Sequence, residues 1–321
     1  MQKYWFICSV LLLVLALGCK NPPTRAQDWM QENGKVKVLC TTAMVADIVQ
    51  GVGGEQIDCL TLIQGENDPH SYQLVKGDDE KFSRADLIFC SGLGLEHGPS
   101  LRAALEHNPK VFSLGDYLHR TYPSSIVFID KTVDPHVWMD VGLWQKTIEM
   151  VSRILSEKMP DQKALLEQNA RSTASRLSQL DAEIAAKLQT VPLDQRYLVT
   201  THDAFNYFTR AYLAPKEELS SSLWRLRCQA PEGLAPDSQL STADIQQLTD
   251  HLIRFNISTI FAESNVSQDS LKKIVDVMHK KGRTVHIAKR PLYADACGTN
   301  SYQDMMQYDA EIIARGLLNG S

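Results

Sequence analysis

The chain has 321 residues, of which 44% are hydrophobic and 22% charged, and its formal net charge at pH 7 is −5. This is the composition of an ordinary globular protein, and the length suits two domains better than one. With a net negative charge, the chain has no excess of basic residues of the kind that binds nucleic acid, so we expect no nucleic-acid partner.

The N-terminus has the features of a lipoprotein signal peptide. An apolar run from Trp5 to Leu17 is too short to span a bilayer and has the length of a signal-peptide core. It ends in Leu-Ala-Leu-Gly before Cys19, which fits a bacterial lipoprotein cleavage site in which Cys19 becomes the lipidated first residue. An ordinary signal peptide or a short anchor is the alternative. We predict a signal peptide over residues 1–19, a lipid anchor to a bacterial membrane at Cys19 in the periplasm, and a flexible tether over residues 20–34.

Short apolar runs alternate with helical patterns after this leader. The expected strands are 35–40, 57–63, 86–90 and 110–113, and the expected helices are 44–52, 77–85 and 99–106. Alternation of this kind predicts a parallel sheet with helices on its faces. We assign these elements to an N-terminal α/β lobe over residues 35–157.

A long helical pattern follows the first lobe. Residues 141–189 contain almost no glycine, and Pro160 suits the first position of a new helix. Apolar residues then recur every three or four positions, which predicts a helix of about 30 residues and about 45 Å. This segment could belong to a helical bundle. Because a second β/α series begins directly after it, we interpret residues 158–190 as a rigid helix that links two lobes.

The second series resembles the first in its alternation. Its expected strands are 196–200, 257–261 and 284–288, and its expected helices are 204–212, 242–254, 267–280 and 302–318. We assign residues 191–321 to a C-terminal α/β lobe. The predicted fold class is therefore α/β, with two (βα)4-like lobes with parallel sheets that are linked by one long rigid helix.

Four residues are candidate metal ligands. The tripeptide Asp-Pro-His occurs twice and ends at His70 and at His136, while His202 and Asp295 each follow a predicted strand of the second lobe. Ligands of open α/β sheets bind beyond the carboxyl ends of the strands, so these side chains are expected to meet in the cleft between the lobes. Three imidazoles and one carboxylate suit a divalent transition metal ion such as Zn²⁺, Mn²⁺ or Fe²⁺.

These four residues do not by themselves establish a metal site. A histidine in such a chain is more often an ordinary loop or core residue, and Asp-Pro turns are common. The remaining histidines receive that ordinary interpretation: His97, His107, His119, His251, His279 and His286.

The sequence motifs around the four candidates resemble a known family. Asp68-Pro69-His70-Ser71-Tyr72 and Asp134-Pro135-His136-Val137-Trp138-Met139-Asp140 resemble the first two ligand motifs of the metal-specific solute-binding lipoproteins of bacterial ABC importers, the TroA-like family. The segments 200–208, around His202, and 292–295, ending at Asp295, resemble the third and fourth. Within that family the motifs look similar to those of chlamydial members.

The resemblance implies an extracytoplasmic binding protein rather than an enzyme. It would capture one Zn, Mn or Fe ion per chain as cargo, between two lobes, for the permease and ATPase of an importer. Zinc-specific members often carry a long His-rich loop that residues 119–133 lack, and many manganese-specific members have Glu where this chain has His202. The sequence therefore does not determine which of these metals the protein binds. We expect a monomer, since no large apolar face suggests obligate assembly.

Two weaker hypotheses concern single residues. Glu263 ends a predicted strand that faces the cleft, where it would either support a ligand or cap a turn. Cys228 and Cys297 lie in polar, loop-like segments, and the oxidising compartment makes a disulfide between them a hypothesis.

Two other functions compete with the carrier. One is a surface adhesin or structural lipoprotein whose metal is incidental. The other is a secreted zinc hydrolase in which three histidines hold zinc and Asp295 acts as a base. Four protein ligands would fill a tetrahedral shell and leave no position for an activated water, which favours the carrier.

Overall fold

The computed structural model describes residues 24–236, 241–298 and 301–319. The predicted signal peptide, Cys19 and residues 20–23 lie outside the described residues. None of the helices within the described part combines the length and hydropathy needed to cross a bilayer.

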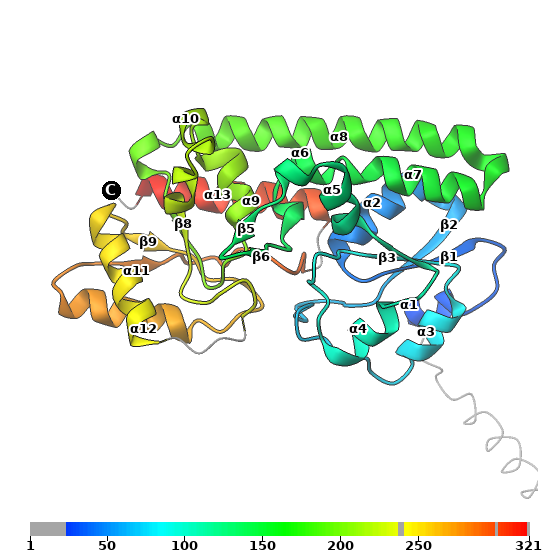
Figure 1. The fold of residues 1–321 in the computed structure, drawn as a ribbon, viewed down its shortest axis with the longest axis horizontal. Coiled ribbons are helices and arrows are strands. Elements are labelled where there is room, and N and C mark those ends of the chain that lie inside the picture. The colour runs from blue at the N-terminus through cyan, green and yellow to red at the C-terminus, as the bar shows by residue number, and fades with distance from the viewer. Residues whose placement is uncertain (1–23, 237–240, 299–300, 320–321) are drawn as a thin grey trace, which may run out of the picture.

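Two lobes lie side by side beneath one long helix, α8 (Lys163–Gln189) (Figure 1). Helices α2 (Ala43–Gly53) and α7 (Thr147–Lys158) of the first lobe pack against α8, and so does α13 (Tyr302–Asn319) of the second. The predicted α/β fold with two lobes and a linking helix is confirmed.

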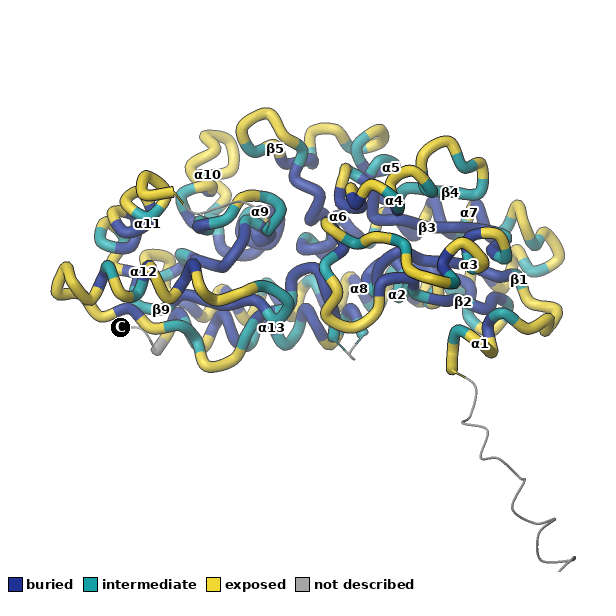
Figure 2. The backbone as a smooth tube through the Cα atoms, turned by 90° about the horizontal axis from the view of Figure 1, so that it is seen from below, coloured by how far each residue is buried: buried dark blue, intermediate teal, exposed yellow. Residues whose placement is uncertain are grey.

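The first lobe is built on a parallel sheet with the strand order β2-β1-β3-β4. Its strands are β1 (Val36–Cys40), β2 (Ile57–Thr61), β3 (Leu87–Cys90) and β4 (Val111–Ser113). Its other helices are α3 (Asp78–Arg84), α4 (Pro99–Leu105), α5 (Leu114–Thr121) and α6 (Val141–Trp144). All the strands and helices predicted here are present, with bounds that differ by one or two residues. The β1 and β3 backbones are buried at the centre of the lobe, as Figure 2 shows.

The second lobe has shorter strands than the apolar runs predict. Its strands form two parallel pairs: β7 (Leu198–Val199) with β8 (Cys228–Gln229), and β9 (Thr259–Ile260) with β10 (His286–Ile287). The Phe261 N–H donates to the Val199 carbonyl at 2.8 Å and joins the two pairs.

Helices cover this second, smaller sheet. They are α9 (Asn206–Phe208), α10 (Lys216–Leu219), α11 (Thr242–Arg254), α12 (Asp269–Lys280) and α13. The predicted helix over 204–212 is split, because α9 continues as a π-helical turn over Thr209–Leu213. A short antiparallel hairpin, β5 (Phe128–Ile129) with β6 (Thr132–Val133), leads from the first lobe towards His136.

The long helix α8 contacts both lobes through one face. Its buried residues recur at helical spacing: Leu166, Ala170, Thr173, Leu177, Leu180, Ile184 and Leu188. Arg176, near its middle, donates to Asp47 of α2 and to Gln303 of α13, each at 3.3 Å. A 3₁₀ turn over Pro160–Gln162 leads directly into α8, so Pro160 is the first residue of the continuous helical segment, as predicted.

The predicted tether is wrong for its described part. Residues Arg25–Trp29 form helix α1, which begins with a capping box between Thr24 and Gln27. The Trp29 side chain is fully buried, and its Nε1–H donates to the Asp58 carbonyl at 2.7 Å. Arg25 donates to the Asp58 carboxylate at 2.6 Å. This aromatic anchor and the ion pair attach the segment to the first lobe.

The predicted Cys228–Cys297 disulfide is also wrong in this structure. Both thiols are free and buried, with exposed fractions of 2% and 1%. Cys228 lies on β8, whereas the Cys297 thiol contacts the Met305 sulfur at 3.4 Å. Polar neighbours in the sequence suggested exposed loops, but each cysteine side chain points into the core and packs there as a small apolar group.

Candidate metal centre

The four predicted ligands meet at one place. The ligand atoms of His70, His136, His202 and Asp295 all lie within 4.8 Å of one another, and all four residues are buried. Each comes from a separate loop: after β2, after the β5–β6 hairpin, after β7 and after β10. The sheets of both lobes therefore aim their loops at a common point beneath α8.

The three imidazoles converge through the same ring nitrogen. His136 Nε2 lies 3.2 Å from His70 Nε2 and 3.4 Å from His202 Nε2. Ligand atoms at about 2.1 Å from a tetrahedral ion are about 3.4 Å apart. The spacing of the nitrogens thus fits a metal ion between them.

Asp295 completes the set from the fourth side. Its Oδ2 lies 3.5 Å from His70 Nε2 and 3.2 Å from His202 Nε2, and its Oδ1 lies 3.4 Å from His136 Nε2. Within the described residues, neither carboxylate oxygen has a hydrogen-bond partner of normal geometry. Burying a carboxylate without hydrogen bonds is costly, and positive charge at the centre, from a metal ion or from protons on the imidazoles, would reduce that cost.

The Asp-Pro-His units are tight turns that present their imidazoles on a stiff backbone. Asp68 accepts the N–H of His70 at 2.8 Å, and Asp134 accepts the N–H of His136 at 2.9 Å. Proline fixes its own φ between the two residues. Asp134 also lies 2.7 Å from His136 Nδ1, which places the proton on Nδ1 and leaves Nε2 free for a metal.

Glu263 plays the corresponding part for His202. It is 1% exposed, and its Oε1 accepts the N–H groups of Thr201 and His202, both at 3.0 Å. Its Oε2 contacts His202 Nδ1. Glu263 also pairs with Leu292 in an isolated parallel bridge, so it joins the loop after β9 to the segment that carries Asp295.

The buried charges shift one another's titration. Burial by itself lowers the pKa of His136, but the Asp134 and Asp295 carboxylates outweigh burial and raise that pKa to about 9. Burial is likewise outweighed at His202, where Glu263 and Asp295 raise the pKa well above its usual value. Burial raises the pKa of Asp295, yet the three imidazoles hold it well below its usual range. A metal ion that binds here displaces protons from the imidazoles.

Two aromatic residues, Trp138 and Tyr302, pack next to the four candidate ligands. Trp138 is fully buried, its ring lies 5.4 Å from the His136 ring, and its Nε1–H donates to the Ala294 carbonyl at 3.0 Å. The Tyr302 hydroxyl donates to the Trp138 carbonyl at 2.5 Å. These bonds connect the His136 turn to the Asp295 segment and exclude water from that side.

Some residues near the centre were not predicted from the sequence. His97, interpreted as an ordinary loop residue, is exposed, yet its ring lies 5.4 Å from that of His70. Asp309 of α13 is fully buried and accepts the Tyr293 N–H at 3.0 Å, which holds the chain two residues before Asp295. No motif marks Asp309, because it resembles any acidic residue of an amphipathic helix.

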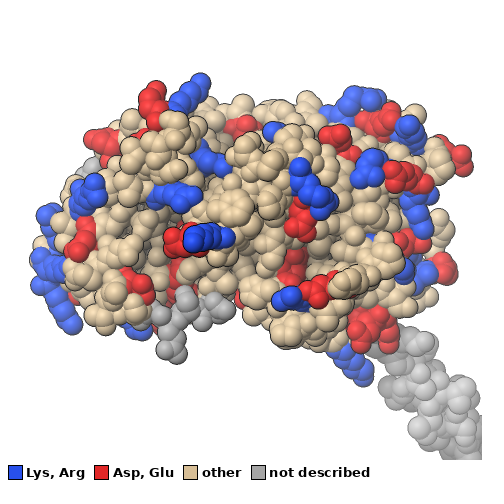
Figure 3. All heavy atoms as spheres, viewed as in Figure 1, with Lys and Arg blue, Asp and Glu red and all other residues tan. Residues whose placement is uncertain are grey.

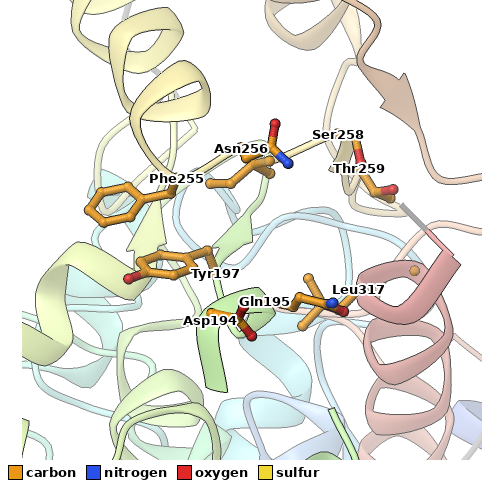
Figure 4. Close-up of a pocket in the computed structure, with 10 residues that line it drawn as sticks. Asp194, Gln195, Tyr197, Phe255, Asn256, Ser258, Thr259 and Leu317 are labelled. Atoms are coloured by element: carbon orange, nitrogen blue, oxygen red, sulfur yellow. The ribbon is translucent and has the colours of Figure 1, made fainter. Parts of the chain in front are cut away.

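A separate cavity of about 180 Å³ lies in the second lobe, away from these ligands. Its walls include Asp194, Gln195 and the stacked rings of Tyr197 and Phe255, as Figure 4 shows. None of the four converging ligands lines it. The metal centre is therefore a buried cluster rather than this hollow.

The fold and the converging donors define a class of protein: two α/β lobes on a linking helix, with a metal-type ligand set between them. The comparisons agree with this class. A family profile described as "Zinc-uptake complex component A periplasmic" matches residues 38–316, and the chain belongs to that family.

Relatives cover nearly the whole chain. The metal-binding protein YtgA of Chlamydia pneumoniae is 38% identical over 93% of this chain and 89% of its own. The metal ABC transporter substrate-binding lipoprotein SsaB of Streptococcus sanguinis is 29% identical over 99% of each chain. The crystal structure of Fe(III)-bound YtgA from Chlamydia trachomatis matches with a TM-score of 0.84 and 36% identity, over 88% of this chain and 98% of that one. Further relatives are named for manganese or zinc. The family thus consists of extracytoplasmic metal-binding components of ABC importers.

Proposed function

We propose that this chain captures one transition metal ion through His70, His136, His202 and Asp295 and delivers it to the permease and ATPase of an ABC importer. The proposal rests on the convergence of four buried side chains from four loops, whose ligand atoms all lie within 4.8 Å of one another. Buried imidazoles and a carboxylate at these spacings suit a transition metal ion, which would replace the protons on the imidazoles.

The geometry favours a carrier over a hydrolase. Both oxygens of Asp295 face imidazole nitrogens, so the carboxylate occupies the position that an activated water would need. All four side chains are buried, with exposed fractions of 3% or less. A peptide or ester has no access to such a site, whereas a bare ion needs only a small opening. The chain on this proposal is not an enzyme.

The cellular setting forms part of the same proposal. A signal peptide over residues 1–19 and lipid attachment at Cys19 would hold the protein on the outer side of a membrane, as in the lipoproteins it is similar to. It acts as a monomer, with its N-terminal lobe over 35–157, its linking helix over 158–190 and its C-terminal lobe over 191–321. On the face seen in Figure 3, acidic and basic side chains are interspersed rather than gathered into one patch.

The proposal covers zinc, manganese and iron, including ferric iron. Asp295 lies at the centre, and Asp134 and Glu263 lie directly behind two of the imidazoles. These three carboxylates balance a trivalent ion and leave one excess negative charge around a divalent one. Relatives named for Fe(III), manganese and zinc are compatible with the same ligand set.

The test is elemental analysis of the purified protein, followed by competitive titration of Mn²⁺, Zn²⁺, Fe²⁺ and chelated Fe³⁺ into metal-stripped protein. We expect one tightly bound ion per chain, lost in His136→Ala and in Asp295→Ala. His279→Ala, an exposed histidine on α12, is the matched control and keeps the ion. Absence of stoichiometric metal in the wild type would favour the adhesin or structural alternative.

A further inference from the structure

We propose that Glu66 is a positioning residue that closes the metal centre by joining the first lobe to the two segments of the second lobe that flank the ligands. This inference rests on the proposed function of the centre. Glu66 lies in the loop between β2 and His70, and its side chain is exposed.

The first observation is a hydrogen bond across the cleft. The Ser264 hydroxyl of the second lobe donates to Glu66 Oε2 of the first. Ser264 directly follows Glu263, whose carboxylate holds His202. Glu66 therefore contacts the chain beside the residue that orients one of the ligands.

The second observation concerns Gly298, three residues after Asp295. A Cβ at this glycine would lie 3.2 Å from Glu66 Oε1 and 3.3 Å from the Tyr293 ring. Gly298 also has a φ of +59°, a conformation that other residues rarely adopt. The absence of a side chain lets the other oxygen of Glu66 approach the Asp295 segment closely.

A single carboxylate is thus bonded to one second-lobe segment through Oε2 and lies close to the other, at Gly298, through Oε1. A hollow of about 380 Å³ lies next to this contact, and its walls include Gln64, Asn67 and Asp295. The hollow thus extends to the Asp295 segment, and Glu66 belongs to the loop that forms its opposite wall, between Gln64 and Asn67. Separation of Glu66 from Ser264 and Gly298 would free that segment and open the centre to the hollow.

Because Glu66 is exposed, its loss is expected to change rates of metal exchange more than folding. A hydrogen bond of this kind has a modest net strength in water, so removing it should accelerate metal release by about three- to tenfold. The stoichiometry of one ion per chain is expected to stay the same, since Glu66 is not a ligand.

The experiment follows the release of Zn²⁺ from the purified, zinc-loaded protein into a fluorescent chelator by stopped flow. Glu66→Ala and Ser264→Ala are each expected to release zinc three- to tenfold faster. The double variant should be no faster than either single variant, because both remove the same contact. Glu66→Gln keeps an acceptor oxygen and is expected to restore most of the slow release. Glu55→Ala, an exposed acidic residue elsewhere in the first lobe, is the matched control with an unchanged rate.

Three results overturn the proposal. An unchanged release rate in Glu66→Ala would show that the contact does not retain the ion. Additive effects in the double variant would show that Glu66 and Ser264 act separately. A wild-type protein without stoichiometric zinc, manganese or iron would overturn the proposed function as well, whereas a protein that binds one ion but releases it independently of Glu66 would overturn only this inference.

Discussion

The carboxylate of Glu263 holds His202 by both its backbone and its ring. One oxygen accepts the His202 N–H at 3.0 Å, and the other contacts Nδ1 of the imidazole. His136 has a similar partner in Asp134, at 2.7 Å from its Nδ1. Two of the three imidazoles are therefore oriented by carboxylates that do not themselves reach the centre.

Glu263→Gln is expected to weaken metal binding by about 10- to 100-fold while the protein stays folded, because the amide cannot orient and polarise His202 as the carboxylate does. Competitive titration with a chelator of known affinity measures the change. Asp134→Asn should behave similarly through His136. An affinity equal to that of the wild type would mean that Glu263 only ties the backbone of Thr201 and His202.

Metal binding is expected to stabilise the folded protein strongly. An ion that binds only the folded state adds about 4 kcal/mol at a thousandfold excess over Kd. Thermal unfolding with and without metal measures this gain as a higher Tm. His136→Ala should show no such rise, and a rise of the same size in that variant would place the ion elsewhere.

Amide hydrogen exchange is expected to report where the protein moves when metal binds. The long helix α8 packs against helices of both lobes, so wide separation of the lobes is disfavoured. Slower exchange should therefore centre on residues 290–298, the segment held by Asp309 and Trp138. Protection changes confined to the sheet of the first lobe would contradict this expectation.

His251 gives the stability of the second lobe a dependence on pH. Burial, with a smaller contribution from Arg254, lowers the pKa of His251 to about 4. Its ring packs against Phe255 with a centroid distance of 4.7 Å. Because the folded pKa lies below the unfolded value of about 6.5, this contribution to stability is complete above pH ~6.5 and is lost as the pH falls towards 4.

His251→Phe should remove that dependence. At pH 5 the wild type is expected to have lost about 2 kcal/mol of stability relative to pH 7.5, a loss that the variant does not suffer. Chemical unfolding of the two metal-stripped proteins at pH 7.5 and pH 5 measures the difference. A stability difference between wild type and variant that is the same at both pH values would show that folding does not lower the pKa of His251.

Much of this structure was predictable because its signals are local. The helix over Thr242–Arg254 was predicted to the residue, and the four strands of the parallel sheet in the first lobe were predicted from their apolar runs. The two-residue strands β5 and β6 were not predicted. The four candidate ligands were identified because each follows a strand signal and lies in a family motif, and the structure brings their side chains together. That these four side chains would meet was expected from the topology of parallel sheets, in which the loops after the strands lie together, and not from the spacing of the residues in the sequence.

The missing parts depend on contacts between distant residues. Trp29 attaches α1 to the first lobe, although its neighbours have the composition of a linker. Cys228 is buried, although polar residues flank it. The hydrogen bond between Glu66 and Ser264 joins two loops that are far apart in the chain, and no sequence pattern predicts their contact. Only the packed structure brings such pairs together.

The most direct measurement is anomalous diffraction from a crystal of the protein loaded with zinc, collected on both sides of the zinc absorption edge. We expect one strong peak per chain, at about 2.0–2.2 Å from Nε2 of His70, His136 and His202 and from the Asp295 carboxylate. A peak held by other residues, or no peak at this centre, would contradict the proposed metal site.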